Sequence, residues 1–403
     1  MYLDEIVAAQ KRGEARGIPS ICSAHPSVLK ETLKVSRTFR TLPLIEATCN
    51  QVNQFGGYTG MTPGDFVAYV RNIAEENNFP FGDIILGGDH LGPSPWQDEK
   101  AEPAMQKAEV LVRDYARAGF SKIHLDCSMR LADDSPGALE VELSARRTAQ
   151  LVRVVEEAAP TPPRYVIGTE VPIPGGAQKH EQGVKVTGVE DARRTIEVTR
   201  VAFIEMGLDA AWERVTALVV QPGVEFGDDF VLPYRAEAAR GLSRFIETQA
   251  MVYEAHSTDY QTPAALKELV RDHFAILKVG PALTFAFRKA VFALAEVEKE
   301  MITRERHSDI LRVLDEAMLK EPGHWKKHYR GTQAEQARKR KFSLSDRIRY
   351  YWTQPEVQTA LARLMRNLGE GPLTGMEDQS AREVIEGRIR AVLEGYYGAC
   401  APQ

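Results

Sequence analysis

The sequence predicts an α/β fold, a (β/α)8 TIM barrel with a C-terminal helical extension. Short apolar segments rich in β-branched residues recur along roughly 280 residues, and a longer amphipathic stretch follows each, which is the rhythm of such a barrel. Near residue 304 this alternation gives way to charged, helical sequence. A doubly wound sheet is the alternative, but no glycine-rich phosphate turn follows the first expected strand.

The expected strands are bounded by Gly, Pro or polar residues. They cover residues 18–23, 44–48, 84–88, 122–127, 165–171, 215–221, 251–257 and 275–280. The helices between them have recognisable ends. Thr62 and Pro63 provide an N-cap and a first helical residue for a helix over 66–75, and the apolar stripe of 104–117 stops before Gly119.

The chain divides into two expected regions. Residues 1–302 form the barrel, ending in a long helical stretch, and residues 303–403 form a helical region packed on the barrel. Tyr351 and Trp352 in this second region need burial, which favours packing over a detached domain. The same region is a candidate for closing the site or for a subunit contact, and we expect an oligomer.

Composition excludes several classes of protein. The 403 residues include 43% hydrophobic and 27% charged residues, which is typical of a globular chain and not of a disordered one. No apolar run is long enough to cross a membrane and no signal peptide is recognisable, so we expect a cytoplasmic protein without a membrane partner. The four cysteines are widely spaced and form no CxxC pair, which favours reduced thiols.

The charge balance predicts no nucleic-acid partner. The 51 Lys and Arg residues against 56 Asp and Glu residues give a net charge of −5. Residues 338–341 form a local basic run, which we interpret as a solvated helix face.

Histidines and carboxylates stand at the ends of the third and seventh expected strands. Asp89-His90 stands at the end of the third, and Glu254 and His256 stand in the last residues of the seventh. These strands oppose each other in an eight-stranded barrel, so their side chains can meet near the axis. Imidazole and carboxylate ligands are typical of divalent metal sites, and we expect zinc as the metal. We expect His90 and His256 as ligands, unless either histidine only pairs with a neighbouring carboxylate.

Glu170, at the end of the fifth expected strand, is the first candidate for a third ligand. His180, in a loop of charged and amide residues, is the second candidate. Asp89 and Asp126 are the candidate catalytic groups. In an extended strand Asp89 points away from His90 and serves as a general acid or base, whereas Asp126 either transfers protons or caps the following helix. Carboxylates beside a Lewis acid suit proton abstraction or retro-aldol cleavage of a ketose.

Neutral polar side chains near the second expected strand suit sugar hydroxyls. The candidate substrate-binding residues are Ser23, Asn50, Gln51, Asn53, Gln54 and Glu254. A phosphate site is expected after the last two strands, where barrels commonly bind this group. The candidate phosphate-binding residues are Ser257, Gly280 and Arg288, unless this segment is an ordinary turn. No GxxxxGK[ST] motif occurs, so the sequence gives no support for a kinase with this nucleotide-binding loop.

Lys278 within the eighth expected strand offers another chemistry. A lysine that is desolvated and has a lowered pKa forms a Schiff base with a ketose, and that reaction needs no histidine cluster. We rank this alternative below the metal site.

At its strand ends the chain resembles the Z-type (GatZ/KbaZ) subunits of D-tagatose-1,6-bisphosphate aldolase. The matching segments span nearly the whole chain, including its helical tail. They are SAHP at 23–26, IEATCNQVNQFGGYTGM at 45–61, GGDHLGP at 87–93, GTEVP at 168–172, YEAHSTDY at 253–260, LKVGPAL at 277–283 and SLSDRIRYYW at 343–352.

The resemblance implies a TIM-barrel protein of ketose, galactitol or amino-sugar catabolism. Such proteins are described as non-catalytic subunits that stabilise a class II aldolase, and relatives in the wider group resemble metal-dependent ketose 4-epimerases. Class II aldolases use an Asp-His pair that maps onto Asp89 and His90, and a late histidine that resembles His256. Their further histidine after the fifth strand has no clear match. The resemblance therefore implies an accessory subunit with a class II aldolase partner and a ketose or ketose-phosphate ligand, with a metal-dependent epimerase or aldolase as the alternative.

Overall fold

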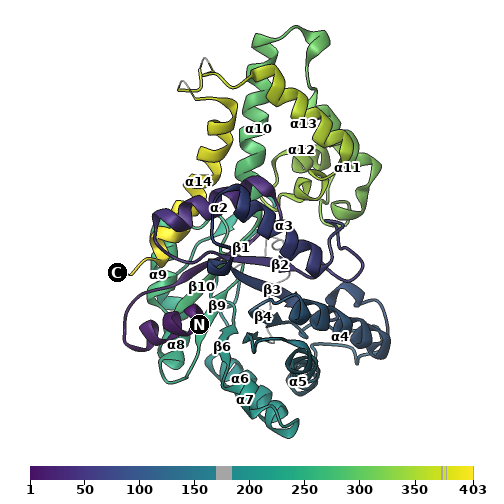
Figure 1. Cartoon of the computed structure of the whole chain (residues 1–403). Coiled ribbons are helices and arrows are strands. Elements are labelled where there is room, and N and C mark those ends of the chain that lie inside the picture. Colours follow the sequence, from purple (N-terminus) through teal and green to yellow (C-terminus); the bar gives the residue numbers. More distant parts are fainter. Residues whose placement is uncertain (169–183, 374, 378, 403) are drawn as a thin grey trace.

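Eight parallel strands close into a barrel in the computed structural model of the chain, which describes residues 1–168, 184–373, 375–377 and 379–402 (Figure 1). The barrel order is β1-β10-β9-β6-β5-β4-β3-β2. The strands are β1 (Ile18–Cys22), β2 (Leu44–Thr48), β3 (Ile85–Leu91), β4 (Lys122–Leu125), β5 (Arg164–Ile167), β6 (Val215–Val219), β9 (Val252–Ala255) and β10 (Phe274–Val279). The predicted (β/α)8 barrel is confirmed, with strand ends displaced by a few residues.

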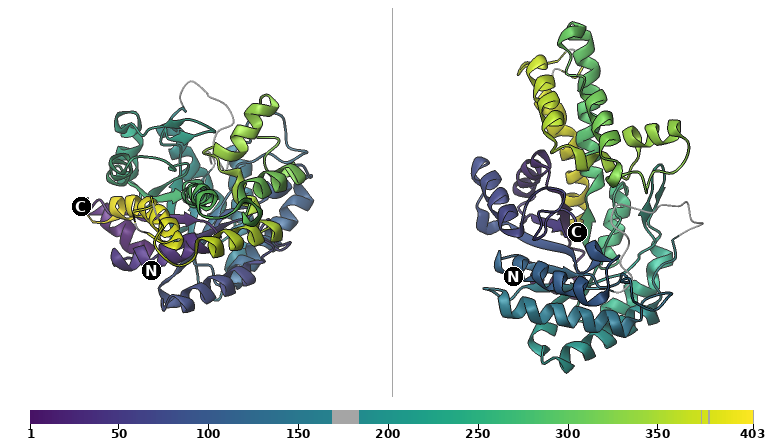
Figure 2. Two further views of the ribbon diagram at one scale, coloured as in Figure 1. Left: turned by 90° about the horizontal axis from the view of Figure 1, so that it is seen from above. Right: turned by 90° about the vertical axis from the view of Figure 1, so that its right-hand side faces the viewer.

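Helices surround the barrel on its outer face (Figure 2). They are α2 (Pro26–Thr38), α3 (Pro63–Glu76), α4 (Ala101–Arg117), α5 (Val141–Ala158), α6 (Val189–Glu205), α7 (Asp209–Trp212), α8 (Ala236–Glu247) and α9 (Pro263–Arg271). The next helix, α10 (Pro281–Met301), starts after β10 and projects beyond the barrel (Figure 1). The expected cap of α3 is present, because the Thr62 side chain accepts a hydrogen bond from the Asp65 backbone N–H. A small antiparallel pair, β7 (Glu225–Phe226) and β8 (Val231–Leu232), was not predicted from the sequence.

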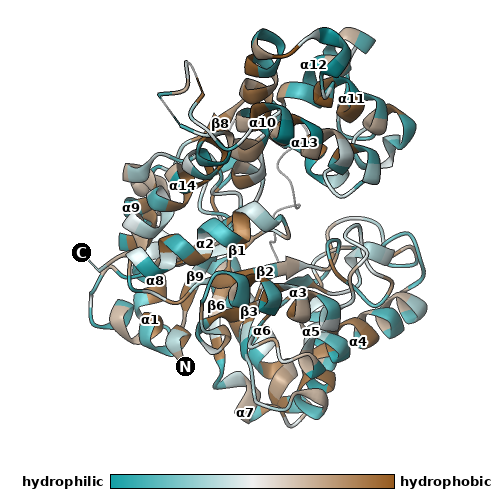
Figure 3. Cartoon of the chain, turned by 45° about the horizontal axis from the view of Figure 1, so that its top comes forward, coloured by the Kyte–Doolittle hydropathy of each residue, from teal (hydrophilic) through white to brown (hydrophobic). Residues whose placement is uncertain are grey.

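The amino-terminal end of the barrel is closed by α1 (Tyr2–Lys11). Its Leu3 and Ile6 pack against the first inward-facing residues of the strands, among them Leu44 and Ile276, and form an apolar cluster separate from the main core. In Figure 3 the hydrophobic colouring gathers on the strands and on the helix faces turned toward them. Within the described residues, no helix combines the length and apolarity needed to cross a bilayer.

The C-terminal helices stand above the carboxyl ends of the strands (Figures 1 and 2). They are α11 (Ile310–Lys320), α12 (Gln333–Phe342), α13 (Pro355–Leu368) and α14 (Ala381–Cys400). α14 packs beside α10 and then along α2 and α9, which joins this region to the barrel. The 3-10 turns are η1 (Phe81–Asp83), η2 (Ser94–Trp96), η3 (Arg304–Arg306), η4 (Pro322–His324) and η5 (Arg347–Tyr351). Of these, η5 reaches the mouth of the barrel.

The basic run on α12 differs from the expected solvated face. Arg340 is buried, with its Nε 2.7 Å from Asp315 Oδ1, and Lys339 Nζ lies 2.9 Å from Asp228 Oδ2. Part of the run therefore anchors α12 through ion pairs within the chain.

Candidate metal centre

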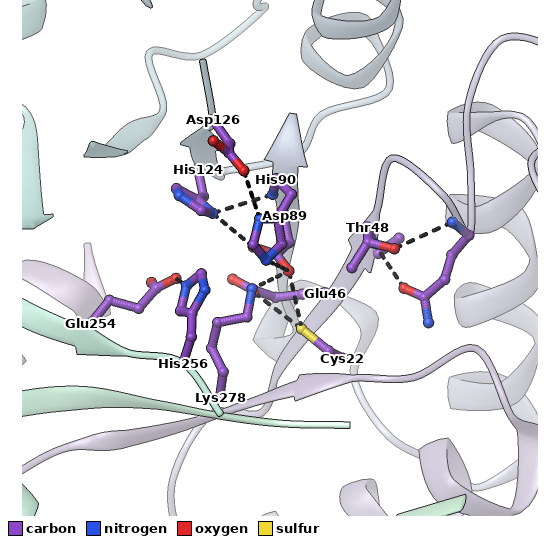
Figure 4. Close-up of polar contacts among 12 residues, drawn as sticks. Cys22, Glu46, Thr48, Asp89, His90, His124, Asp126, Glu254, His256 and Lys278 are labelled. Atoms are coloured by element: carbon purple, nitrogen blue, oxygen red, sulfur yellow. Dashed lines mark hydrogen bonds and ion pairs between the residues drawn. The ribbon is translucent and has the colours of Figure 1, made fainter. Parts of the chain in front are cut away.

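Three imidazoles converge at the carboxyl ends of the strands, as Figure 4 shows. His90 comes from β3, His124 from β4 and His256 from the residue after β9. Their ring centroids are 4.9 Å to 5.1 Å apart. Together with Asp89 they offer four ligand atoms that all lie within 4.8 Å of one another, and all four residues are buried. The chain thus has a buried His/Asp group that could hold a metal ion.

Each imidazole is oriented by one carboxylate. Asp126 Oδ2 lies 2.9 Å from His90 Nδ1, and Asp89 Oδ1 lies 2.8 Å from His124 Nδ1. Glu254 Oε1 lies 2.9 Å from His256 Nε2. The His124 Nδ1 also lies 3.2 Å from the backbone N–H of His90. In the tautomer whose N–H faces the carboxylate, the opposite ring nitrogen has a free lone pair, which is the usual outer-shell arrangement of metal-ligating histidines.

The opposite ring nitrogens fit a metal. His124 Nε2 and His256 Nδ1 are buried and have no hydrogen-bond partner among the described residues. Buried polar atoms without partners are rare and call for an explanation. Three converging nitrogens beside a carboxylate match the ligand chemistry of a divalent transition metal, so the residues present fit such an ion.

The backbone at His90 explains why neighbouring residues both reach the centre. His90 has a φ of 49°, in the left-handed region that non-glycine residues rarely adopt. The expectation that Asp89 points away from His90 assumed an extended strand and is wrong. Instead, Asp89 Oδ2 lies 3.7 Å from His90 Nε2. Strain of this kind gathers at functional sites.

A layer of buried charges lies directly beneath the imidazoles. Lys122 Nζ lies 2.5 Å from Glu46 Oε1 and 2.6 Å from Glu254 Oε2, and none of the three side chains is exposed. Gly87 leaves room for this layer, because a Cβ there would lie 2.6 Å from Glu46 Oε1. Because Glu254 also holds His256, Lys122 connects the charged layer to the centre.

Lys278 is held as an ammonium ion. Its Nζ forms an ion pair with Asp89 and lies 3.4 Å from Glu46 Oε2. Burial works against the charged form, yet Asp89 and other acidic neighbours keep the pKa of Lys278 well above its usual value. A Schiff-base lysine needs the opposite shift. The imine alternative is therefore disfavoured.

Asp126 lies behind His90. Burial opposes its charge, but its hydrogen bond to His90 and the neighbouring imidazoles hold the pKa of Asp126 below its usual value. Its Oδ1 accepts hydrogen bonds from the Ser128 backbone and hydroxyl. Both oxygens are therefore engaged, and the residue does not line the mouth cavity.

A cavity of about 670 Å³ opens above the centre. It is lined by eight of the residues singled out from the sequence, namely Asn50, Gln51, Asp89, His90, His256, Ser257, Lys278 and Gly280. Ser23 lines a neighbouring cavity of about 990 Å³ instead. The two cavities share a wall formed by Cys22, Gln51, Tyr58, Gly280 and Arg349.

Three candidate sugar-binding residues are used within the fold. Asn53 donates to the Cys49 carbonyl at 2.9 Å and Gln54 donates to the Lys107 carbonyl at 3.0 Å. Glu254 is buried between Lys122 and His256. None of the three lines the mouth cavity.

The expected phosphate site is also arranged differently. The backbone N–H groups of Gly280 and Ala282 donate to Asp259 Oδ1 at 3.1 Å and 2.8 Å, so the start of α10 already holds an anion. Burial raises the pKa of Asp259 to about 6, although these hydrogen bonds lower it. Arg288 lies away from both cavities, with its Nε 3.2 Å from Asp346 Oδ1.

The remaining candidate ligands, Glu170 and His180, lie outside the described residues. The third imidazole that the structure brings to the centre, His124, was missed in the sequence. One signal was available: His124 precedes Asp126 by two residues in the same expected strand, and residues two apart lie on the same face of a strand. This spacing could have placed His124 at the centre together with Asp126. Arg349 and Tyr350 were also missed as cavity residues, because no local pattern connects η5 to the strand ends.

The chain matches known proteins along its whole length. Residues 3–401 match the family described as D-tagatose-1,6-bisphosphate aldolase subunit GatZ/KbaZ-like. A protein of Klebsiella pneumoniae named D-tagatose-1,6-bisphosphate aldolase subunit GatZ is 53% identical over 92% of this chain and 88% of its own length. The protein of the same name in Salmonella heidelberg is 49% identical over 99% of both chains.

A solved structure is also similar. The crystal structure of a probable tagatose 6 phosphate kinase from Sinorhizobium meliloti 1021 has a TM-score of 0.87 and 45% identity, over 96% of this chain and 100% of that one. Together these comparisons confirm the resemblance seen in the strand-end motifs.

Proposed function

Because the chain belongs to the GatZ/KbaZ-like family of D-tagatose-1,6-bisphosphate aldolase subunits, we propose that it is the accessory subunit of a class II aldolase. The match over residues 3–401 is the observation that carries this proposal, because it includes both the barrel and the C-terminal helices. The partner is the separate catalytic subunit, and the proposal includes an oligomeric assembly in the cytoplasm.

Co-expression with the partner aldolase tests the accessory role. We expect the partner to keep its aldolase activity longer at elevated temperature when the chain is present, since a protein that binds only the folded partner stabilises it. The measurement is the half-life of aldol cleavage with and without the chain. Equal half-lives, together with separate elution of the two proteins in size-exclusion chromatography, would reject the role.

We further propose that the buried centre binds zinc through His90, His124 and His256, with Asp89 beside them. The orphan ring nitrogens of His124 and His256 support this proposal. A divalent ion held there would supply a Lewis acid that polarises a ketose carbonyl. Asn50 and Gln51 line the same cavity and would orient sugar hydroxyls.

A second candidate function is a metal-dependent ketose or ketose-phosphate epimerase or aldolase. The observation that favours it is the cavity above the centre, whose lining includes Asp89 beside His90 and His256. Asp89 would move a proton at the carbon next to the carbonyl. Kinase activity is not part of the proposal, because the sequence has no nucleotide-binding glycine motif.

Metal analysis of the purified chain tests the centre. The wild-type chain should carry about one equivalent of metal, and His124→Ala or His256→Ala should carry almost none. His273→Ala is the matched control, since this histidine is bonded to Gln10 far from the centre. Equal metal content in all four proteins would reject the site. Incubating the metal-loaded chain with tagatose, fructose and their phosphates, followed by NMR of the products, tests the second function.

A further inference from the structure

Arg349 connects the C-terminal region to the barrel mouth. It lies on η5 and lines both the cavity above the metal centre and the neighbouring cavity. Tyr350, from the same turn, lines the first cavity and packs edge-to-face against Tyr58, with ring centroids 4.6 Å apart. A segment far from the strands in sequence thus forms part of the cavity wall.

Among the described residues, the guanidinium of Arg349 donates hydrogen bonds to neutral groups. It donates to the carbonyls of Ser345 and Asp346 and, at 2.9 Å, to the hydroxyl of Tyr350. No described carboxylate oxygen lies within ion-pair distance of it, whereas the nearby buried Arg288 is paired with Asp346 at 3.2 Å. Cations in such surroundings are normally paired, and within the described part of the chain Asp346 acts on Arg349 only from beyond ion-pair distance, which leaves Arg349 able to pair with the anion of a ligand.

The other positive groups of the mouth already face carboxylates. Lys278 is paired with Asp89, and the amides at the start of α10 bind Asp259. A ligand anion would be repelled by these carboxylates and would have to displace them. Arg349 offers a planar fork of N–H donors without such competition, and this geometry suits phosphate oxygens.

We propose that Arg349 binds the phosphate group of a ketose phosphate, whose carbonyl end lies over His90, His124 and His256. This inference rests on the proposed ketose pocket and names its ligand class, a phosphorylated ketose. The hydroxyls of Tyr58 and Tyr350 complete the polar wall around the phosphate. The C-terminal region then selects the ligand, while the barrel holds its reactive end.

Calorimetric titration with D-tagatose 6-phosphate, D-tagatose and inorganic phosphate tests this assignment. The wild-type chain should bind the phosphorylated ketose about tenfold to a hundredfold more tightly than the neutral ketose, as expected for charged hydrogen bonds. Inorganic phosphate should compete with the phosphorylated ketose. Arg349→Gln should lose the preference, and Arg349→Lys should keep part of it, because the charge remains without the fork.

Arg312→Gln is the control. Arg312 lies on α11 of the same C-terminal region, pairs with Glu316 at 2.8 Å and lines neither cavity, so this variant should keep the wild-type preference. Thermal unfolding of each variant shows whether it is folded. The comparison of the two ketoses with the wild-type chain tests the inference even if a variant does not fold. The inference is overturned if the wild-type chain binds both ketoses equally or neither, or if folded Arg349→Gln retains the preference.

The accessory role is measured separately, as the effect of the wild-type chain on its partner aldolase. A chain that stabilises the partner but shows no preference for the phosphorylated ketose would reject only the assignment of Arg349. A chain that shows the Arg349-dependent preference without affecting the partner would reject only the accessory role.

Discussion

The two ends of the barrel interior are built from the same strands but differ in chemistry. On β2, Leu44 belongs to the apolar cluster closed by α1, and Glu46, two residues later, belongs to the charged layer. On β10, Ile276 and Lys278 make the same change. Residues two apart face the same side of a strand, so on both strands the surroundings change from apolar to ionic within one alternation.

This difference separates stability from function. The apolar end is stabilised by removing surface from water and needs no specific partners. The charged end is stable only while each group keeps its partner, because an unpaired buried charge is costly. We therefore interpret the charged layer as a support that orients the three imidazoles above it, and not as a source of net stability.

The largest effect is expected from removing the central cation of the charged layer. Lys122→Met leaves Glu46 and Glu254 buried without their partner and should lower the free energy of unfolding by about 3–5 kcal/mol. Chemical denaturation with metal removed measures it. The double variant with Glu254→Gln should lose less than the sum of the single losses, since the two residues are in contact. A loss below about 1 kcal/mol for Lys122→Met, less than breaking a buried pair costs, would show that the layer is not ionic.

A substitution at the apolar end should affect stability alone. Leu44→Ala removes a fully buried side chain and should cost about 2–5 kcal/mol in the free energy of unfolding. Metal affinity of the folded variant should stay at the wild-type value, because Leu44 touches no ligand of the centre. A fall in metal affinity comparable to that of a histidine variant would contradict the separation of the two ends.

The smallest effect should appear in metal binding. Glu254→Gln keeps the shape of the side chain but removes the charge that orients His256, and should weaken metal affinity by about tenfold to a hundredfold. Competition with a chromogenic chelator measures it. Glu31→Gln is the control, since Glu31 is equally buried and paired with Arg390 outside the barrel interior. If both variants bind metal equally well, Glu254 does not position His256.

Local patterns were sufficient for the barrel and for half of the centre. Short apolar segments separated by amphipathic stretches predicted all eight strands, because the alternation of strand and helix is a property of neighbouring residues. The same patterns placed Asp89, His90 and His256 at strand ends. Opposing strands of a closed barrel then brought His90 and His256 together, with ring centroids 4.9 Å apart.

The other half depended on contacts between distant residues. His124 approaches the centre because β4 lies beside β3, and Asp89 joins His90 only because the backbone of His90 leaves the extended conformation. The amides expected to bind phosphate are occupied by Asp259, whereas Arg349 arrives from the C-terminal region.

The sequence by itself therefore determined the fold class, the family and the kinds of ligand atoms at the mouth, since these follow from local composition and spacing. The tertiary structure decided which of those atoms meet and which are already paired. Pairing depends on distances of a few ångströms between segments remote in the chain, and no local pattern records them.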